Sequence, residues 1–101
     1  MLTFVKTGAQ NGAIEYTAQS DGEQIGTCRL MLDGTSVRLT YTVQAYEPFV
    51  LASAVNAAAS FGLRVTAAPD ERLTAYGFRR TGADMAVEPQ DVVFPHDCKK
   101  V

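Results

Sequence analysis

The sequence contains no tryptophan, a single histidine and only two cysteines among its 101 residues. So few thiols and imidazoles argue against a disulfide-rich scaffold and against a closed zinc site, and we expect no metal cofactor. Cys28 lies among apolar residues, which indicates a small buried core residue. We expect Cys28 and Cys98 to be reduced thiols, as in a cytoplasmic protein.

Long apolar runs and an excess of basic residues are absent as well. The longest apolar stretch, Phe49 to Phe61, is interrupted by polar residues and is shorter than the roughly 20 residues that cross a bilayer. Nine Lys and Arg against eleven Asp and Glu give a net charge of −2, so the chain lacks the basic surface of a nucleic-acid-binding domain. The N-terminal residues do not read as a signal peptide. We therefore expect a cytoplasmic protein whose partners are neither membranes nor nucleic acids.

Turn signals divide the first half of the chain at Asn11-Gly12, Asp21-Gly22 and Asp33-Gly34. These dipeptides favour the left-handed conformations of type I′ turns, which join antiparallel strands. Apolar and polar residues alternate between the turns, most clearly from Ser36 to Gln44, and such alternation predicts strands. Residues Leu2 to Gln44 are therefore expected to form a meander of up to four antiparallel strands.

The pattern changes from strand to helix after Tyr46. Pro48 suits the first turn of a helix, and the residues that follow it are apolar at helical spacing. The expected elements are a helix over Phe49 to Phe61, a strand over Leu63 to Ala67, a short helical turn over Glu71 to Tyr76 and one further strand over Phe78 to Val87. The succession of strand, helix and strand predicts a crossover that joins two parallel strands.

These elements define an α+β fold, in which an antiparallel β-meander is followed by a β-α-β crossover and a terminal strand. Hydrophobic residues make up 47% of the chain and charged residues 20%, as in an ordinary globular protein. Because the length suits one domain, we expect residues 1–101 to form a single domain.

The order of elements and the segment Phe49 to Phe78 resemble the GNAT family of N-acyltransferases. In that family a meander leads into an acyl-CoA-binding helix, followed by a strand, a second helix and a turn with a Gly-Phe pair. The matching segments are the helix Phe49 to Phe61, then Gly62-Leu63-Arg64-Val65-Thr66, then Tyr76-Gly77-Phe78-Arg79-Arg80-Thr81-Gly82. The resemblance covers residues 13–90 and implies a GNAT-like mixed sheet.

The resemblance also implies acetyl-CoA as the cofactor and an acetyl transfer to a small-molecule or peptide amine. Members of the family hydrogen-bond the pantetheine arm to the end of the central strand. They hold the pyrophosphate at the N-terminus of the following helix, where N–H groups are unpaired. The corresponding cofactor-binding residues are Thr42, Val43, Gln44, Ala45, Phe49 and Val50.

The catalytic residues follow from the same resemblance. The amine attacks the thioester directly, a base takes the amine proton, and a tyrosine four residues before the Gly of the Gly-Phe pair protonates the leaving thiolate. That position is Leu73 in this sequence. We take the nearby Tyr76 as the candidate acid and Glu47 as the candidate base.

Besides Leu73 at the expected tyrosine position, two further features depart from the family pattern. The loop after Gln44 has no glycine, and Glu47 and Pro48 stand where amides would meet the pyrophosphate. The front of the chain also has no room for the family's two early helices. The alternative functions are therefore a GNAT-fold binding or interaction module without catalysis, or a fragment of a larger acetyltransferase. An edge strand also offers a route to a homodimer.

Overall fold

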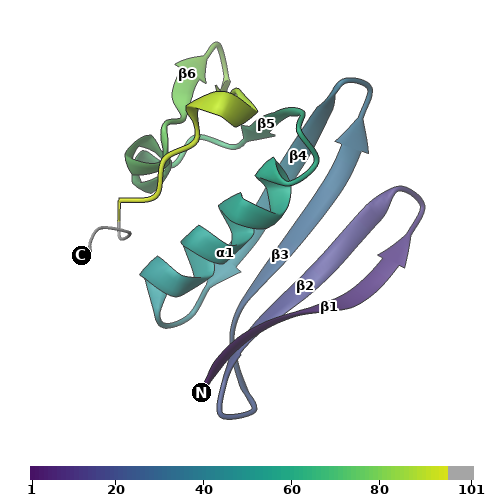
Figure 1. The fold of residues 1–101 in the computed structure, drawn as a ribbon, viewed down its shortest axis with the longest axis vertical. Coiled ribbons are helices and arrows are strands. Elements are labelled where there is room, and N and C mark those ends of the chain that lie inside the picture. Colours follow the sequence, from purple (N-terminus) through teal and green to yellow (C-terminus); the bar gives the residue numbers. More distant parts are fainter. Residues whose placement is uncertain (96–101) are drawn as a thin grey trace.

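Residues 1–95, which the computed structural model describes, fold into one mixed sheet and one α-helix (Figure 1). The strands are β1 (Leu2–Gln10), β2 (Ala13–Ser20), β3 (Glu23–Asp33), β4 (Ser36–Val43), β5 (Arg64–Ala67), β6 (Arg79–Thr81) and β7 (Asp84–Val87). The helices are α1 (Glu47–Ala59) and two short 3-10 helices, η1 (Glu71–Tyr76) and η2 (Pro89–Asp91). The strand order is β1-β2-β3-β4-β5-β7-β6, and β4 runs parallel to β5. Cys98 lies outside the described residues.

The predicted meander of four antiparallel strands is confirmed by β1 to β4. Asn11-Gly12 and Asp21-Gly22 have positive φ at both residues, as type I′ turns require. The third turn is different, because β3 includes Asp33 and the loop is Gly34-Thr35. Only Gly34 of this pair has a positive φ, which defines a type II′ turn. The expected type I′ turn at Asp33-Gly34 was therefore wrong. A type II′ turn needs a glycine only at its first loop position, and Gly34 occupies that position.

The helix α1 begins at Glu47, two residues before the predicted start, and Pro48 lies in its first turn. Its buried residues face the sheet and are Val50, Leu51, Ala54, Val55 and Ala58. Gly26 in β3 permits this close packing, because a Cβ atom there would lie 2.7 Å from both the Val50 side chain and the Thr42 carbonyl oxygen. The helix thus covers one face of the sheet (Figure 1).

The C-terminal part of the chain differs from its prediction. Phe78 to Val87 was expected to be one strand, but it forms the antiparallel hairpin of β6 and β7. The reversal follows from the positive φ of Gly82, 69°. The prediction of a single terminal strand was wrong. The apolar and polar pattern on the two sides of Gly82 does not indicate that the strand ends there. The predicted strand at Leu63 and the helical turn from Glu71 are confirmed by β5 and η1.

The core lies between α1, the central strands and η1, and it includes Leu30, Val37, Leu39, Val65 and Leu73. Cys28 is buried in it, as predicted. Burial raises the pKa of the Cys28 thiol to about 12, so this thiol stays protonated and unreactive at neutral pH.

Candidate functional site at the junction of β4 and β5

The strand β4 has two halves with different neighbours. Its paired half, Ser36–Leu39, lies parallel to Arg64–Ala67 of β5. Its distal half, Thr40–Val43, extends past the end of β5, because the chain leaves the sheet after Ala67 and continues towards η1. The parallel strands therefore separate at the point where Leu39 faces Ala67, and this separation is the β4–β5 junction.

The main chain of the distal half offers hydrogen-bonding groups to the junction. The Gln44 N–H donates to the Ile25 carbonyl oxygen at 2.8 Å, in register with the β3–β4 ladder. Antiparallel pairs alternate between bonded and non-bonded, so the main-chain groups of Val43 and Tyr41 point away from β3. They face the side on which β5 has already ended.

Four side chains span the junction, and we call them the junction network: Glu47, Tyr41, Asp70 and Arg72. The Tyr41 hydroxyl donates to Asp70 Oδ2 at 2.5 Å. Asp70 caps η1 by accepting the Arg72 main-chain N–H at 3.0 Å, as short acidic residues do at a helix start. The Arg72 guanidinium donates to Asp70 Oδ2 at 2.8 Å and to Glu47 Oε1 at 2.9 Å. The junction network therefore ties β4 to η1 and to the first turn of α1.

The network moves the pKa values of Asp70, Tyr41 and Arg72 away from neutral pH. The Arg72 side chain is the main reason that the pKa of Asp70 falls to about 2. Burial, together with the hydrogen bond to Asp70, raises the pKa of the Tyr41 phenol above its ordinary value. Hydrogen bonds to Asp70 and Glu47 raise the pKa of Arg72. A general acid or base is most effective when its pKa lies near the working pH, and these groups are not set in that way.

The two predicted catalytic residues lie in the same part of the molecule. Glu47 is in the junction network, and its charge contributes to the raised pKa of Tyr76, although burial of the phenol is the larger cause. Tyr76 is only 2% exposed and stacks edge-to-face with Phe94, with ring centroids 6.1 Å apart. Its position in the core leaves it little access to a substrate.

Three amides of the predicted cofactor-binding segment are already bonded within the fold. The N–H groups of Gln44 and Ala45 both donate to the Ile25 carbonyl oxygen, at 2.8 and 3.2 Å. The Val50 N–H donates to the Tyr46 carbonyl oxygen at 3.1 Å, within the first turn of α1. These amides are therefore occupied by the fold.

Neither the start of α1 nor the side chains of Phe49 and Thr42 offer another site for the pyrophosphate. Pro48 has no N–H, and the Glu47 carboxylate places negative charge at the helix N-terminus, which disfavours an anion. Phe49 packs its ring against the cluster of Ala18, Ile25 and Val50, and the Thr42 hydroxyl bonds Thr27 at 2.7 Å. The residues present thus fit an extended ligand along β4 but do not fit the pyrophosphate of a coenzyme.

Sequence reasoning missed Asp70 and Arg72 as site residues. A local signal for part of this arrangement exists, since an aspartate immediately before a predicted helical turn is a typical N-cap. The link to Tyr41 and Glu47 has no such signal, because it joins residues that are brought together only by the fold.

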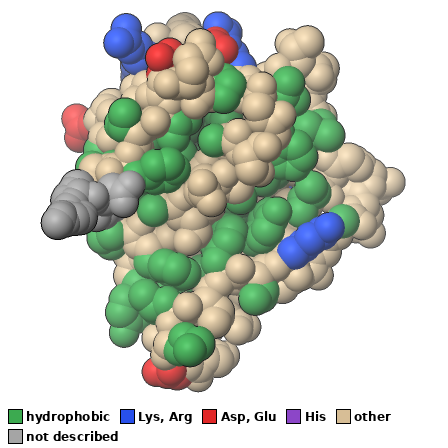
Figure 2. Space-filling view, in the orientation of Figure 1, with side chains coloured by type: hydrophobic (Ala, Val, Ile, Leu, Met, Phe, Trp, Pro, Cys, Tyr) green, Lys and Arg blue, Asp and Glu red, His purple; other side chains and the backbone are tan. Residues whose placement is uncertain are grey.

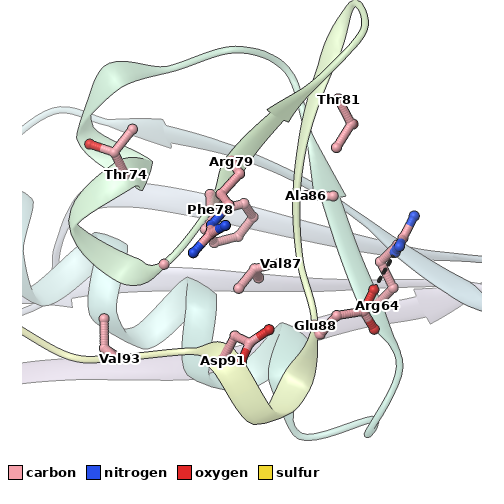
Figure 3. Close-up of a pocket in the computed structure, with 11 residues that line it drawn as sticks. Arg64, Thr74, Phe78, Arg79, Thr81, Ala86, Val87, Glu88, Asp91 and Val93 are labelled. Atoms are coloured by element: carbon pink, nitrogen blue, oxygen red, sulfur yellow. Dashed lines mark hydrogen bonds and ion pairs between the residues drawn. The ribbon is translucent and has the colours of Figure 1, made fainter.

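A separate pocket, of about 530 Å³, lies between η1, the β6–β7 hairpin and η2 (Figure 3). Arg79 lines it, but so do the acidic side chains of Glu88 and Asp91. Arg64 is already paired with Glu88 at 2.6 Å. Mixed charge of this kind selects no single ligand class, so we regard the junction as the better candidate.

Comparisons with known proteins give no family for the chain. No protein-family model matches it, and no curated protein is significantly similar to it. Within the described residues, no three His, Cys, Asp or Glu side chains converge as metal ligands. The helices of this part of the chain do not reach the length and apolar character of a membrane span.

Proposed function

We propose that the chain is a GNAT-like domain that acts as a binding or interaction module without catalysis. The order of elements supports the resemblance: a meander, a helix, a strand parallel to the last meander strand and a short helix that ends at Gly77-Phe78. The free thiol of Cys28 suits a reducing compartment such as the cytoplasm.

The junction network is the single observation that carries the choice of a non-catalytic module. It places an ion-paired carboxylate, Asp70, beside the point of strand separation, and the pKa of this carboxylate is about 2. An acetyl transfer would need a base for the amine proton near neutral pH. It would also need amides for the coenzyme pyrophosphate, and those of Gln44 and Ala45 are already bonded to Ile25.

A second candidate is an acetyl-CoA-dependent N-acetyltransferase that acts on a small-molecule or peptide amine. The main chain of Tyr41 and Val43 favours it, because it faces the junction beyond the end of β5. Direct attack of an amine on a thioester requires positioning and an oxyanion donor, and no protein nucleophile. In that case Glu47 would serve as the base and Tyr76 as the acid, either in this chain alone or in a larger acetyltransferase of which it is a part.

A titration with acetyl-CoA, followed by amide NMR, separates the two candidates. The module predicts no saturable shift of the amides from Thr42 to Leu51 at about millimolar ligand, the weak end of binding affinities, and no amine-dependent release of CoA. Saturable shifts in the natural chain would contradict it, and amine-dependent release would establish the acetyltransferase.

A double variant tests the reason for the absence of binding. Glu47→Gln with Pro48→Ala removes the negative charge and restores an N–H at the start of α1. Because a helix N-terminus with free amides attracts phosphate, this variant should gain measurable affinity for acetyl-CoA over the natural chain. Arg79→Gln, on the β6–β7 hairpin, is the matched control and should gain none.

A further inference from the structure

The strand β1 is an outer strand of the sheet in the part of the chain that the structure describes. The Asp21 N–H donates to the Met1 carbonyl oxygen at 3.0 Å, in register with the β1–β2 ladder. Because bonded and non-bonded pairs alternate along an antiparallel ladder, Thr3 and Val5 bond to β2. The main-chain groups of Leu2, Phe4 and Lys6 therefore point outward, away from the sheet.

A β-bulge limits this outward-facing stretch. The β1–β2 register shifts between Lys6 and Gly8, and a bulge of this kind interrupts the regular ladder. The regular edge is thus Leu2–Lys6, with Phe4 at its centre. An edge of this form is symmetric about Phe4, so it complements an inverted copy of itself.

We propose that β1 pairs antiparallel with β1 of a second copy of this chain, with Phe4 opposite Phe4 on the two-fold axis. In this register Leu2 lies opposite Lys6 of the second copy, and every outward-facing residue finds a main-chain partner. A register with Lys6 opposite Lys6 would bring like charges together, which is unfavourable in a sheet. A register with Val5 opposite Val5 would place Leu2 against the bulge at Gly8.

The side chains of the edge suit this pairing on both faces. On the α1 face, Phe4 stacks on Tyr16 with ring centroids 4.9 Å apart, and a second Phe4 would extend this stack. Figure 2 shows hydrophobic side chains that continue from α1 towards the β1 edge. On the other face, Val5 is 43% exposed and would lie against Thr3 of the second copy. Pairing would remove both apolar surfaces from water.

Amide hydrogen exchange tests the pairing within one strand. Thr3 and Val5 supply the internal control, because their N–H groups are already bonded to β2. The proposal predicts that the exchange of Phe4 and Lys6 slows as the protein concentration rises, while Thr3 and Val5 change little, and that the mass in light scattering rises towards a dimer. Unchanged exchange at Phe4 and a monomer mass up to about 1 mM, the weak end of specific association, would overturn it.

Charge-pair variants test the register. Thr3 and Val5 of opposite copies are cross-strand neighbours, and each such pair contributes roughly 0.2–1 kcal/mol. Thr3→Lys with Val5→Lys should therefore weaken the dimer roughly two- to thirtyfold, since two pairs are affected. Thr3→Glu with Val5→Lys should tighten it by a similar factor. If the opposite-charge variant weakens the dimer as well, Val5 lies opposite Val5 and the register centred on Phe4 is wrong.

The pairing does not depend on the proposed function. Its failure would leave the junction network and the acetyl-CoA titration unaffected, because Phe4 and the junction lie on opposite sides of the meander.

Discussion

The paired and distal halves of β4 solve the same structural problem in different ways. In the paired half, Val37 and Leu39 are fully buried beneath α1 and beside β5, so apolar packing holds the neighbouring strands together. Beside the distal half β5 has already ended, and Tyr41 instead reaches Asp70 through a hydrogen bond. In β4, polar side chains therefore form the connection at the point where the main-chain ladder with β5 stops.

The largest effect is expected from the paired half. Leu39→Ala should lower the free energy of unfolding by about 2–5 kcal/mol, because it opens a cavity in the core. Val43→Ala is the matched change in the distal half and should cost clearly less, since Val43 is only half-buried. Urea denaturation of both variants measures the difference, and an equal or larger loss for Val43→Ala would contradict the stronger apolar packing of the paired half.

Asp70 should give the next largest effect. Asp70→Ala removes the N-cap of η1 together with the bonds to Tyr41 and Arg72, and we expect a loss of about 1–2 kcal/mol in the free energy of unfolding. Asp70→Asn keeps the cap but removes the charge, so it should retain part of that stability. An alanine variant as stable as the natural chain would show that the distal half needs no bridge.

The contribution of the Asp70 carboxylate to the free energy of unfolding should depend on pH. The pKa of Asp70 in the folded protein is about 2, below the value of about 3.9 for an unfolded chain. Its contribution to stability is therefore complete above about pH 4 and is lost as the pH falls towards 2. Asp70→Asn should lack this part of the acid destabilisation, and identical acid profiles for the two proteins would contradict the pairing.

Tyr41→Phe removes only the hydroxyl of the bridge. It should lower the free energy of unfolding by about 0.5–1.5 kcal/mol, the net value of one hydrogen bond. Tyr16→Phe is the control, because within residues 1–95 no hydrogen bond is found for the Tyr16 hydroxyl while its ring packs on Phe4. Thermal unfolding of the two variants should therefore separate them, and equal losses would mean that the Tyr41 hydroxyl contributes nothing.

The smallest effect belongs to Glu47. Its ion pair with Arg72 joins two side chains that are 49% and 42% exposed, and exposed pairs contribute about 0–1 kcal/mol. Glu47→Gln should change stability by less than Asp70→Ala, and the change should shrink in high salt. If Glu47→Gln lowered the free energy of unfolding more than Asp70→Ala, the contact of Arg72 with α1 would be more important than the contact of Asp70 with β4.

The two halves of β4 also mark how far the sequence could predict the structure. Alternation in Ser36 to Gln44 predicted the strand and its buried face, because a period of two follows directly from strand geometry. The helix after Pro48 and the parallel β5 followed from equally local patterns. These features could be predicted because neighbouring residues in the sequence are enough to recognise them.

The features that the sequence did not predict mostly depend on contacts between residues that are far apart in the sequence. Arg72 meets Glu47 only after the crossover returns the chain to β4, and no local pattern encodes that meeting. The hairpin at Gly82 was missed because a single glycine is compatible with either a strand or a turn. The occupied amides of Gln44 and Ala45 likewise depend on Ile25, which lies in another strand.

We infer that Asp70 and Tyr41 keep their protonation states near neutral pH and do not transfer protons there. A carbon-13 NMR titration of the Asp70 carboxyl and the Tyr41 phenol measures this directly. We expect that Asp70 titrates near pH 2 and that Tyr41 does not ionise below the ordinary tyrosine value of about 10. Titration of either group between about pH 6 and 8, where general acids and bases work, would contradict it.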